Sequence, residues 1–162
     1  MKNSKGVTLV ELIVILVLIG ILAVFVAPRM TDVTATKAGA FSDKLRADIR
    51  HARNLAMTEN RRYRVYVNSA PAPASGYAVV SDKDGDGNWG EAGAGEIAFD
   101  PAGSGGLVVT LNTGEYTGIT LAPNAIIEFD STGRPTLGGG TVLTVSPGGG
   151  TVTVIDQTGA VN

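Results

Sequence analysis

An uninterrupted apolar segment near the N-terminus limits how this chain can fold. Sixteen consecutive residues from Leu12 to Ala27 are apolar or glycine, and the segment counted from Val7 has 21 residues. At the rise of an α-helix, a segment of that length extends about 32 Å and can cross the hydrocarbon layer of a bilayer. We therefore predict a transmembrane helix over residues 7–28.

The residues that flank this run indicate its orientation and argue against ordinary signal cleavage. Lys2 and Lys5 precede it, and basic residues tend to remain in the cytoplasm, which sends the rest of the chain outward. A secretory signal has a shorter apolar region and ends at an Ala-x-Ala site. Here the nearest such triplet, residues 38–40, begins eleven residues after the run ends.

Composition excludes several kinds of active site. Cysteine is absent, which excludes disulfide scaffolds, thiolate zinc sites and cysteine nucleophiles. His51 is the single histidine, which argues against a multi-histidine metal centre and a Ser/His relay. The sequence contains no Gly-x-Ser-x-Gly elbow and no phosphate-binding loop. We therefore expect no enzyme, and we expect His51 at the surface or at its boundary.

Charge divides the chain into a basic and an acidic part. Residues 37–64 carry eight bases and three acids, a local charge of +5, whereas residues 65–162 carry two bases and ten acids, a local charge of -8. An acidic domain repels phosphate, so nucleic acid is not an expected partner and we assign no DNA-binding residue.

After Pro28 the pattern predicts a second helical half over residues 29–61. Apolar residues recur there every three or four positions, which is typical of a helix that packs on a sheet: Phe41, Leu45, Ile49, Ala52 and Ala56. The opposite face carries Asp43, Arg46, Arg50 and Arg53. We expect that basic face to contact solvent, with neighbouring subunits as the alternative.

Residues 62–162 have the pattern of an antiparallel β domain. Short β-rich runs bounded by Gly, Pro, Asn or Asp cover residues 62–67, 76–80, 106–111, 125–129, 141–145 and 151–155. The last two runs repeat with a ten-residue offset, which predicts a hairpin that turns at residues 147–149. The expected fold is α+β, a long N-terminal helix packed on a C-terminal antiparallel sheet.

Glu11 lies inside the 21-residue segment that begins at Val7, where a carboxylate near the bilayer centre would cost roughly 2.5 to 3.5 kcal/mol. At headgroup depth, near a helix N-terminus, the charge would need no partner. Alternatively, Glu11 pairs with a cation of another chain. The residues alone leave both interpretations open.

One loop has the composition of a cation site. Oxygen-bearing side chains alternate with glycines at Asp82, Asp84, Asp86, Asn88 and Glu91. Its first six positions fit a calcium-binding EF-hand loop, but the twelfth is Gly93 where that loop requires a bidentate Glu. Glu91 or Glu96 could supply that ligand in another geometry. The alternative is a solvated turn without metal.

At the N-terminus, Lys5-Gly6 is followed by Val7 to Leu12 with Glu11, and then by the long apolar run. This motif resembles the class III signal peptide of type IV pilins and type II secretion pseudopilins. The resemblance implies that prepilin peptidase removes residues 1–6 by cutting after Gly6 and methylates the new N-terminus at Val7, where most members have phenylalanine.

The same resemblance implies the functions of other positions. Glu11 would pair with the terminal amine of a neighbouring subunit, and Gly20 and Pro28 match positions where family helices bend or melt in filaments. The implied partners are other pilin or pseudopilin subunits, the peptidase, the inner-membrane assembly platform and membrane lipid. The implied location is a single pass through the inner membrane with a periplasmic head.

The β-rich part, residues 62–162, contains Phe129 to Pro135, the strands that follow, and a terminal Asp156 to Gly159. These features are similar to the heads of the GspH/FimT group of minor pilins and pseudopilins. The similarity implies a filament subunit of a type II secretion pseudopilus or a type IV pilus. Two alternatives are a FimT-like DNA receptor for DNA uptake, whose C-terminal bases have no counterpart here, and a membrane-anchored calcium-binding or adhesion module that does not polymerise.

Overall fold

The computed structural model describes residues 8–26, 29–91, 95–103 and 105–162. The chain divides into two compact units, Met1–Thr34 and Ala35–Asn162. The first contains helix α1, Leu9–Val26, and the start of helix α2, Arg29–Thr58. The second contains the rest of α2 and all the strands, and we call it the head.

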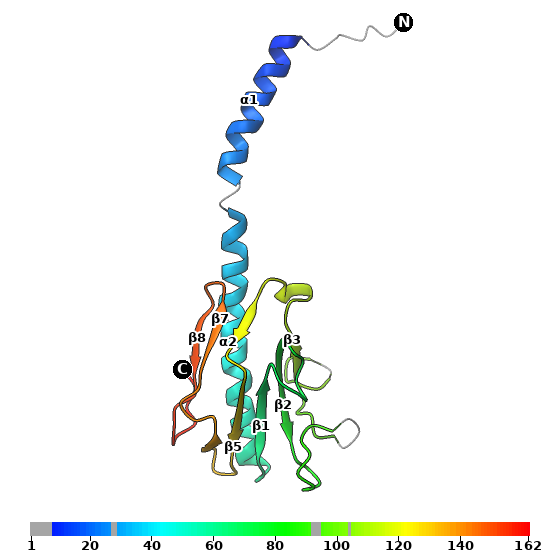
Figure 1. Cartoon of the computed structure of the whole chain (residues 1–162), viewed down its shortest axis with the longest axis vertical. Helices are drawn as coiled ribbons and strands as arrows, with labels where there is room; N and C mark the ends of the chain where they lie inside the picture. The colour runs from blue at the N-terminus through cyan, green and yellow to red at the C-terminus, as the bar shows by residue number, and fades with distance from the viewer. Residues whose placement is uncertain (1–7, 27–28, 92–94, 104) are drawn as a thin grey trace, which may run out of the picture. The chain divides into compact units, whose positions relative to one another are not determined.

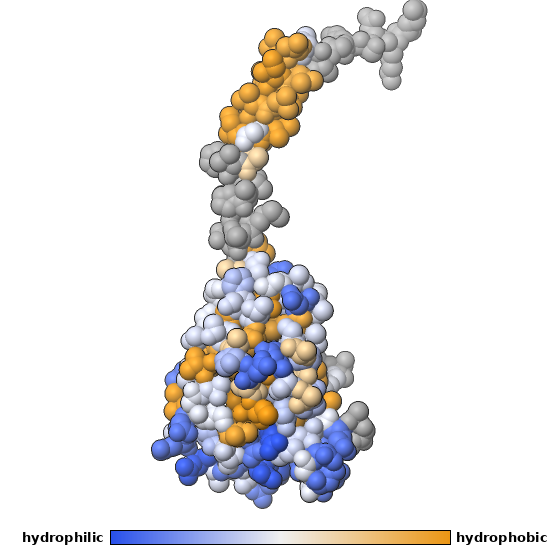
Figure 2. Space-filling view, viewed as in Figure 1, coloured by the Kyte–Doolittle hydropathy of each residue, from blue (hydrophilic) through white to orange (hydrophobic). Residues whose placement is uncertain are grey.

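Helix α1 is apolar on every side. Its large apolar side chains from Leu9 to Leu22 are each about half exposed or more, from 48 % at Ile15 to 75 % at Leu9. Figure 2 shows apolar side chains along the visible face of this helix. The predicted span of residues 7–28 reaches beyond the described helix. Within the described residues, no helix has both the length and the hydropathy that crossing a membrane requires.

In the described part of the chain, eight strands form two antiparallel sheets (Figure 1). The five-stranded sheet has the order β3-β2-β1-β5-β6, and the three-stranded sheet the order β4-β7-β8. The strands are β1 Tyr63–Val67, β2 Gly76–Ser81, β3 Val108–Thr110, β4 Thr120–Ala122, β5 Ala125–Phe129, β6 Pro135–Leu137, β7 Val142–Ser146 and β8 Gly150–Thr153. A short 3-10 helix, η1 Gly114–Tyr116, lies between β3 and β4.

The apolar stripe predicted on α2 forms the centre of the head's core. Its five residues are at most 1 % exposed, and they share one cluster with inward-facing residues of both sheets, such as Val65, Phe129 and Leu143. Burying such a stripe against a sheet is what holds a helix of this composition in place. The expected α+β fold, with a helix packed on antiparallel sheet, is confirmed.

The C-terminal hairpin is also confirmed, because β7 and β8 pair antiparallel with Leu143 opposite Val152. The sequence missed β4 and β6, which are three residues long. Helix α2 ends at Thr58, slightly before the predicted end, and Asn60 follows with a φ of 52°. His51 is half-buried, as expected.

Candidate functional site

The residues predicted for processing and assembly are only partly described. Gly6, Val7 and Pro28 lie outside the described residues. Glu11 is exposed in the first turn of α1, and its backbone N–H donates to Thr8 Oγ1 at 3.2 Å. This is the Thr-x-x-Glu pattern of a helix N-terminus, in which the threonine hydroxyl caps a free backbone N–H. Thr8 thus fixes the start of α1 and places Glu11 in its first turn.

Gly20 lies within α1, and a Cβ added there would meet no atom within 4 Å. Nothing in the described chain therefore requires a glycine at this position. Its function in bending the helix within a filament stays a prediction, as does the pairing of Glu11 with a neighbouring amine.

The acidic loop brings three of its five predicted ligands together. Asp82, Asp84 and Asp86 each offer a carboxylate oxygen within 4.8 Å of the others. Clustered oxygens of this kind suit a hard cation such as calcium. They also accept hydrogen bonds from the loop's own backbone, including the N–H groups of Gly87 at 3.2 Å and Asn88 at 2.7 Å. Such bonds close a turn without metal, so calcium stays a prediction.

The other two predicted ligands lie differently. Asn88 Nδ2 donates to Asp86 Oδ2 at 2.8 Å, so this amide is attached to the cluster. Glu91 is exposed and does not join the group of three aspartates. Gly90, just before Glu91, has a φ of 77°, a backbone conformation that favours glycine. A Cβ on Gly90 would lie 2.7 Å from Val80 Cγ1.

Glu96 closes the base of this loop instead of supplying a ligand oxygen. The residue is 1 % exposed and accepts backbone N–H groups from Lys83 at 2.7 Å, Gly90 at 2.9 Å and Glu91 at 3.1 Å. Burial opposes the charge, but these hydrogen bonds outweigh it and hold the pKa of Glu96 below its ordinary value. Its carboxylate therefore fixes both ends of the segment that carries the three aspartates.

Trp89 attaches the same loop to the outer face of the five-stranded sheet. The guanidinium carbon of Arg64 lies 3.9 Å from the centre of the Trp89 ring, in a cation-π contact. Arg64 Nε also donates to the buried Glu128 at 2.6 Å, and Thr136 Oγ1 donates to the same carboxylate at 2.7 Å. Burial opposes the charge of Glu128, but these two donors outweigh it and lower its pKa. This cluster was not predicted from the sequence, although Arg64 alternates with the core residues Tyr63 and Val65.

The basic face of α2 contacts solvent only in part: Asp43 and Arg50 are exposed, but the arginines of this face also bind carbonyls of the chain itself. Arg50 Nη2 donates to the Val161 carbonyl at 2.6 Å, and Arg53 Nε donates to the Gly133 carbonyl at 2.9 Å. Arg46 Nη2 reaches the Thr151 carbonyl at 3.4 Å. These arginines bind backbone carbonyls of residues 133–161, the C-terminal segment of their own head.

Arg134, the last basic residue of the chain, is engaged in the same region. Its Nε donates to the carbonyl of Gln157 at 3.1 Å, and its backbone N–H donates to Asp130 Oδ1 at 3.0 Å. Asp130 also accepts the hydroxyl and the backbone N–H of Thr132, and these bonds lower its pKa. This turn is thus held by the residues that the sequence comparison with GspH/FimT heads had singled out.

Comparison with known proteins finds two family models. Residues 1–27 match the model described as prokaryotic N-terminal methylation motif. Residues 42–159 match the model described as type II transport protein GspH. The second match covers 118 of the 162 residues, which is most of the head.

No curated protein matches the chain. Among solved structures, two crystal forms of the type IV minor pilin FimU from Pseudomonas aeruginosa are similar to it, each with 14 % identity and a TM-score of 0.44. Each covers 75 % of this chain, together with 83 % or 87 % of the FimU chain.

Proposed function

We propose that this chain serves in a type II secretion pseudopilus. It belongs to the GspH family of type II transport proteins and carries an N-terminal methylation motif, so it is a minor pseudopilin or pilin subunit. The observation that carries this proposal is the GspH match over residues 42–159. The alternative machine is a type IV pilus, whose subunits have the same kind of helix and similar heads.

The subunit is made as a precursor with residues 1–6 as its leader. Prepilin peptidase cuts after Gly6 and methylates Val7, and the segment of residues 7–28 holds the protein in the inner membrane with the head in the periplasm. The methylation-motif match over residues 1–27 and the apolar surface of α1 support this. A helix that exposes apolar side chains on every side needs lipid or other subunits around it.

Assembly depends on Glu11. Its place in the first turn of α1, beside the Thr8 cap, keeps the carboxylate near the N-terminus that processing creates. An amine at the end of a neighbouring subunit would neutralise that carboxylate in a low-dielectric environment, where an unpaired charge is costly. The pair would then set the register between adjacent helices.

Substitution of Gly6 tests the processing step. We expect Gly6→Val to leave an uncut precursor, whereas the native chain should begin at N-methyl-Val7 in mass spectrometry. Gly20→Val is the matched control, because it adds the same side chain at a position with free space and should be processed normally. A native chain that retains Met1, or that begins after Ala40, would contradict the pilin assignment.

Two further experiments test assembly and the choice of machine. Glu11→Leu should be processed and inserted but poorly incorporated into filaments, because it gains hydrophobicity and loses the registering charge. Normal incorporation would show that Glu11 needs no partner. A clean deletion, assayed in parallel for exoprotein secretion, surface motility and DNA uptake, separates the pseudopilus from the pilus and from a DNA receptor.

A further inference from the structure

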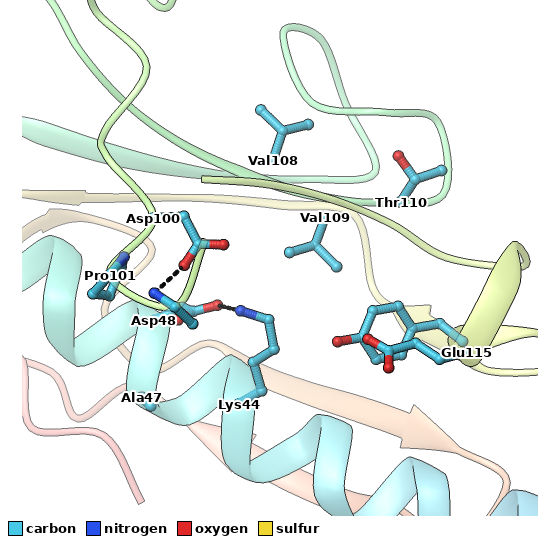
Figure 3. Close-up of a pocket in the computed structure, with 11 residues that line it drawn as sticks. Lys44, Ala47, Asp48, Asp100, Pro101, Val108, Val109, Thr110 and Glu115 are labelled. Carbon is cyan, nitrogen blue, oxygen red and sulfur yellow. Dashed lines mark hydrogen bonds and ion pairs between the residues drawn. The ribbon is translucent and has the colours of Figure 1, made fainter. Parts of the chain in front are cut away.

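A groove of about 660 Å³ runs between α2 and the edge of the five-stranded sheet. One wall is α2 with Lys44, Ala47 and Asp48, and the other is β3 with the turn of residues 100–102. Figure 3 shows Lys44 and Asp48 of α2 facing Asp100 and Val109 across the groove, with Glu115 of η1 at one end, whereas Val108 and Thr110 point to the other side of β3. All of these residues belong to the head.

The backbone of β3 is free to accept another strand along this groove. Leu111 N–H donates to the Ser75 carbonyl, and Leu107 accepts the Val79 N–H, so these positions point toward β2. The alternate residues Val108 and Thr110 therefore direct their backbone groups away from β2. In the described chain the Val108 N–H donates to the Gly106 carbonyl at 2.8 Å. The outward groups that remain for another strand are the Val108 carbonyl and the Thr110 N–H.

The two edges of this sheet differ in how they are protected. The edge strand β6 begins with Pro135 and pairs with β5 through an irregular register, and both features discourage the addition of a further strand. Strand β3 has neither proline nor charge, and Val108 on it is 41 % exposed. Its contact with β2 is close, since a Cβ on Gly76 would lie 2.0 Å from the Val109 carbonyl oxygen.

The groove is negatively charged. Its lining has three carboxylates and one ammonium group, a formal charge of -2 (three acids and one base). Lys44 Nζ lies 2.8 Å from Asp48 Oδ2 and neutralises it, so Asp100 and Glu115 carry the remaining charge. Burial and the hydrogen bond with Glu115 raise the pKa of Tyr116 to about 12, and the charges of Asp48 and Asp100 act in the same direction.

We propose that this groove binds an extended segment of a partner protein, which adds to β3 as a strand and places a lysine or arginine side chain between Asp100 and Glu115. In a parallel strand, a residue laid beside Val109 would donate its N–H to the Val108 carbonyl and accept the Thr110 N–H, so it would satisfy both outward backbone groups of the edge. Its side chain would point to the same side of the sheet as that of Val109, which faces the core and the groove. Its two neighbours in sequence would lie beside Val108 and Thr110 on the other side, where apolar or threonine side chains fit.

The test uses two capped peptides and the full chain in detergent micelles. One peptide is Thr-Val-Lys-Val-Thr, and its control has glutamate in place of lysine. Binding is measured by fluorescence anisotropy, and the backbone contact by the NMR shift of the Thr110 amide. We expect the lysine peptide to bind, to shift that amide, and to bind at least about tenfold more tightly than the glutamate peptide.

Charge variants isolate the two carboxylates. The double variant Asp100→Asn/Glu115→Gln should weaken binding of the lysine peptide about tenfold. Asparagine preserves the oxygen that accepts the Ala102 N–H at 2.8 Å, so the turn is maintained. The matched control Glu91→Gln/Asp156→Asn removes the same charge elsewhere on the head and should leave affinity within about twofold.

The backbone variant Thr110→Pro removes the outward N–H and should weaken binding of the lysine peptide, with circular dichroism as the check on folding. Equal binding of the two peptides, undiminished binding by the double charge variant, or no binding at all would overturn the proposal. The proposal would also be overturned if the chain self-associates in the absence of peptide and Thr110→Pro abolishes that self-association, because the occupant of the groove would then be a second copy.

Discussion

Glu96→Gln should destabilise the head by releasing the acidic loop. The carboxylate of Glu96 is buried, and its Oε2 accepts the N–H groups of Gly90 and Glu91 while Oε1 accepts that of Lys83. Glutamine retains one acceptor oxygen and turns an NH₂ group toward donors. It can therefore satisfy one end of the loop but not both.

The size of the effect follows from these contacts. A hydrogen bond to a charged acceptor contributes about 1.5 to 3 kcal/mol, and one to a neutral acceptor about 1 kcal/mol. With its oxygen toward Gly90 and Glu91, glutamine loses the bond from Lys83 and keeps the other two as weaker bonds to a neutral acceptor. Since the loop can relax, we expect a loss of about 3 kcal/mol in the free energy of unfolding. For a chain of this size, that lowers Tm by about 6 to 12 °C. Glu91→Gln is the matched control, because it removes one charge from an exposed side chain nearby.

The single tryptophan, Trp89, lies in the affected loop, so its fluorescence can follow thermal unfolding of the full chain in detergent. Amide exchange at Lys83 should accelerate in the variant but not in the control. A decrease of less than about 0.5 kcal/mol, with unchanged exchange, would refute the reasoning.

The effect should also depend on pH. Folding lowers the pKa of Glu96, so its contribution is fully present above the unfolded pKa of about 4.3 and is lost as pH falls through the folded value. The stability difference between the native chain and Glu96→Gln should therefore be full at pH 7 and narrow below about pH 4. A constant difference across this range would show that the charge of Glu96 is not responsible.

Three shorter predictions concern the rest of the head. Tyr77→Phe removes the hydroxyl that donates to the buried Asp48 at 2.5 Å, and it should cost about 2 kcal/mol in thermal unfolding; a neutral result would mean that Asp48 needs no second donor. If the three loop aspartates share a calcium ion, calcium should raise Tm in the native chain but not in Asp84→Ala, and identical values in calcium and chelator would favour the plain turn. The chain should bind DNA weakly and lose it by physiological salt; a gel shift at submicromolar protein in about 150 mM salt, abolished by Arg134→Ala, would contradict this.

Local periodicity accounts for what the sequence could predict of the fold. The stripe from Phe41 to Ala56 marks the buried face of α2, because each of its members must reach the same sheet. The runs that became β1, β2, β5 and the C-terminal hairpin are long enough to show β-rich composition between turn residues. Strands β4 and β6 are three residues long, and β6 begins with proline, so neither has a local pattern to detect.

The candidate sites could be predicted only where the chemistry is local. The three aspartates of the acidic loop are close together because they alternate within five residues. Glu96, and not Glu91, closes the base of that loop because three backbone N–H groups converge on its carboxylate. The alternation of aspartates and glycines in the sequence does not indicate where those N–H groups meet. The stacking of Trp89 on Arg64 likewise joins residues that are distant in sequence and meet only once β1 and the loop are placed.

The arginines of α2 contribute to the basic charge of residues 37–64, but their guanidinium groups bind carbonyls of the same chain. Arg50 and Arg53 bind carbonyls of Val161 and Gly133, which lie 111 and 80 residues away in sequence. Carbonyls carry no formal charge, so these bonds leave the basic and acidic totals of the two parts unchanged. They do, however, direct the guanidinium donors into the chain's own C-terminal segment. A phosphate would have to displace those carbonyls to reach the same donors, and the acidic head would oppose its approach. The contacts and the net field thus disfavour nucleic acid for independent reasons, while the same arginines hold the C-terminal segment against the helix.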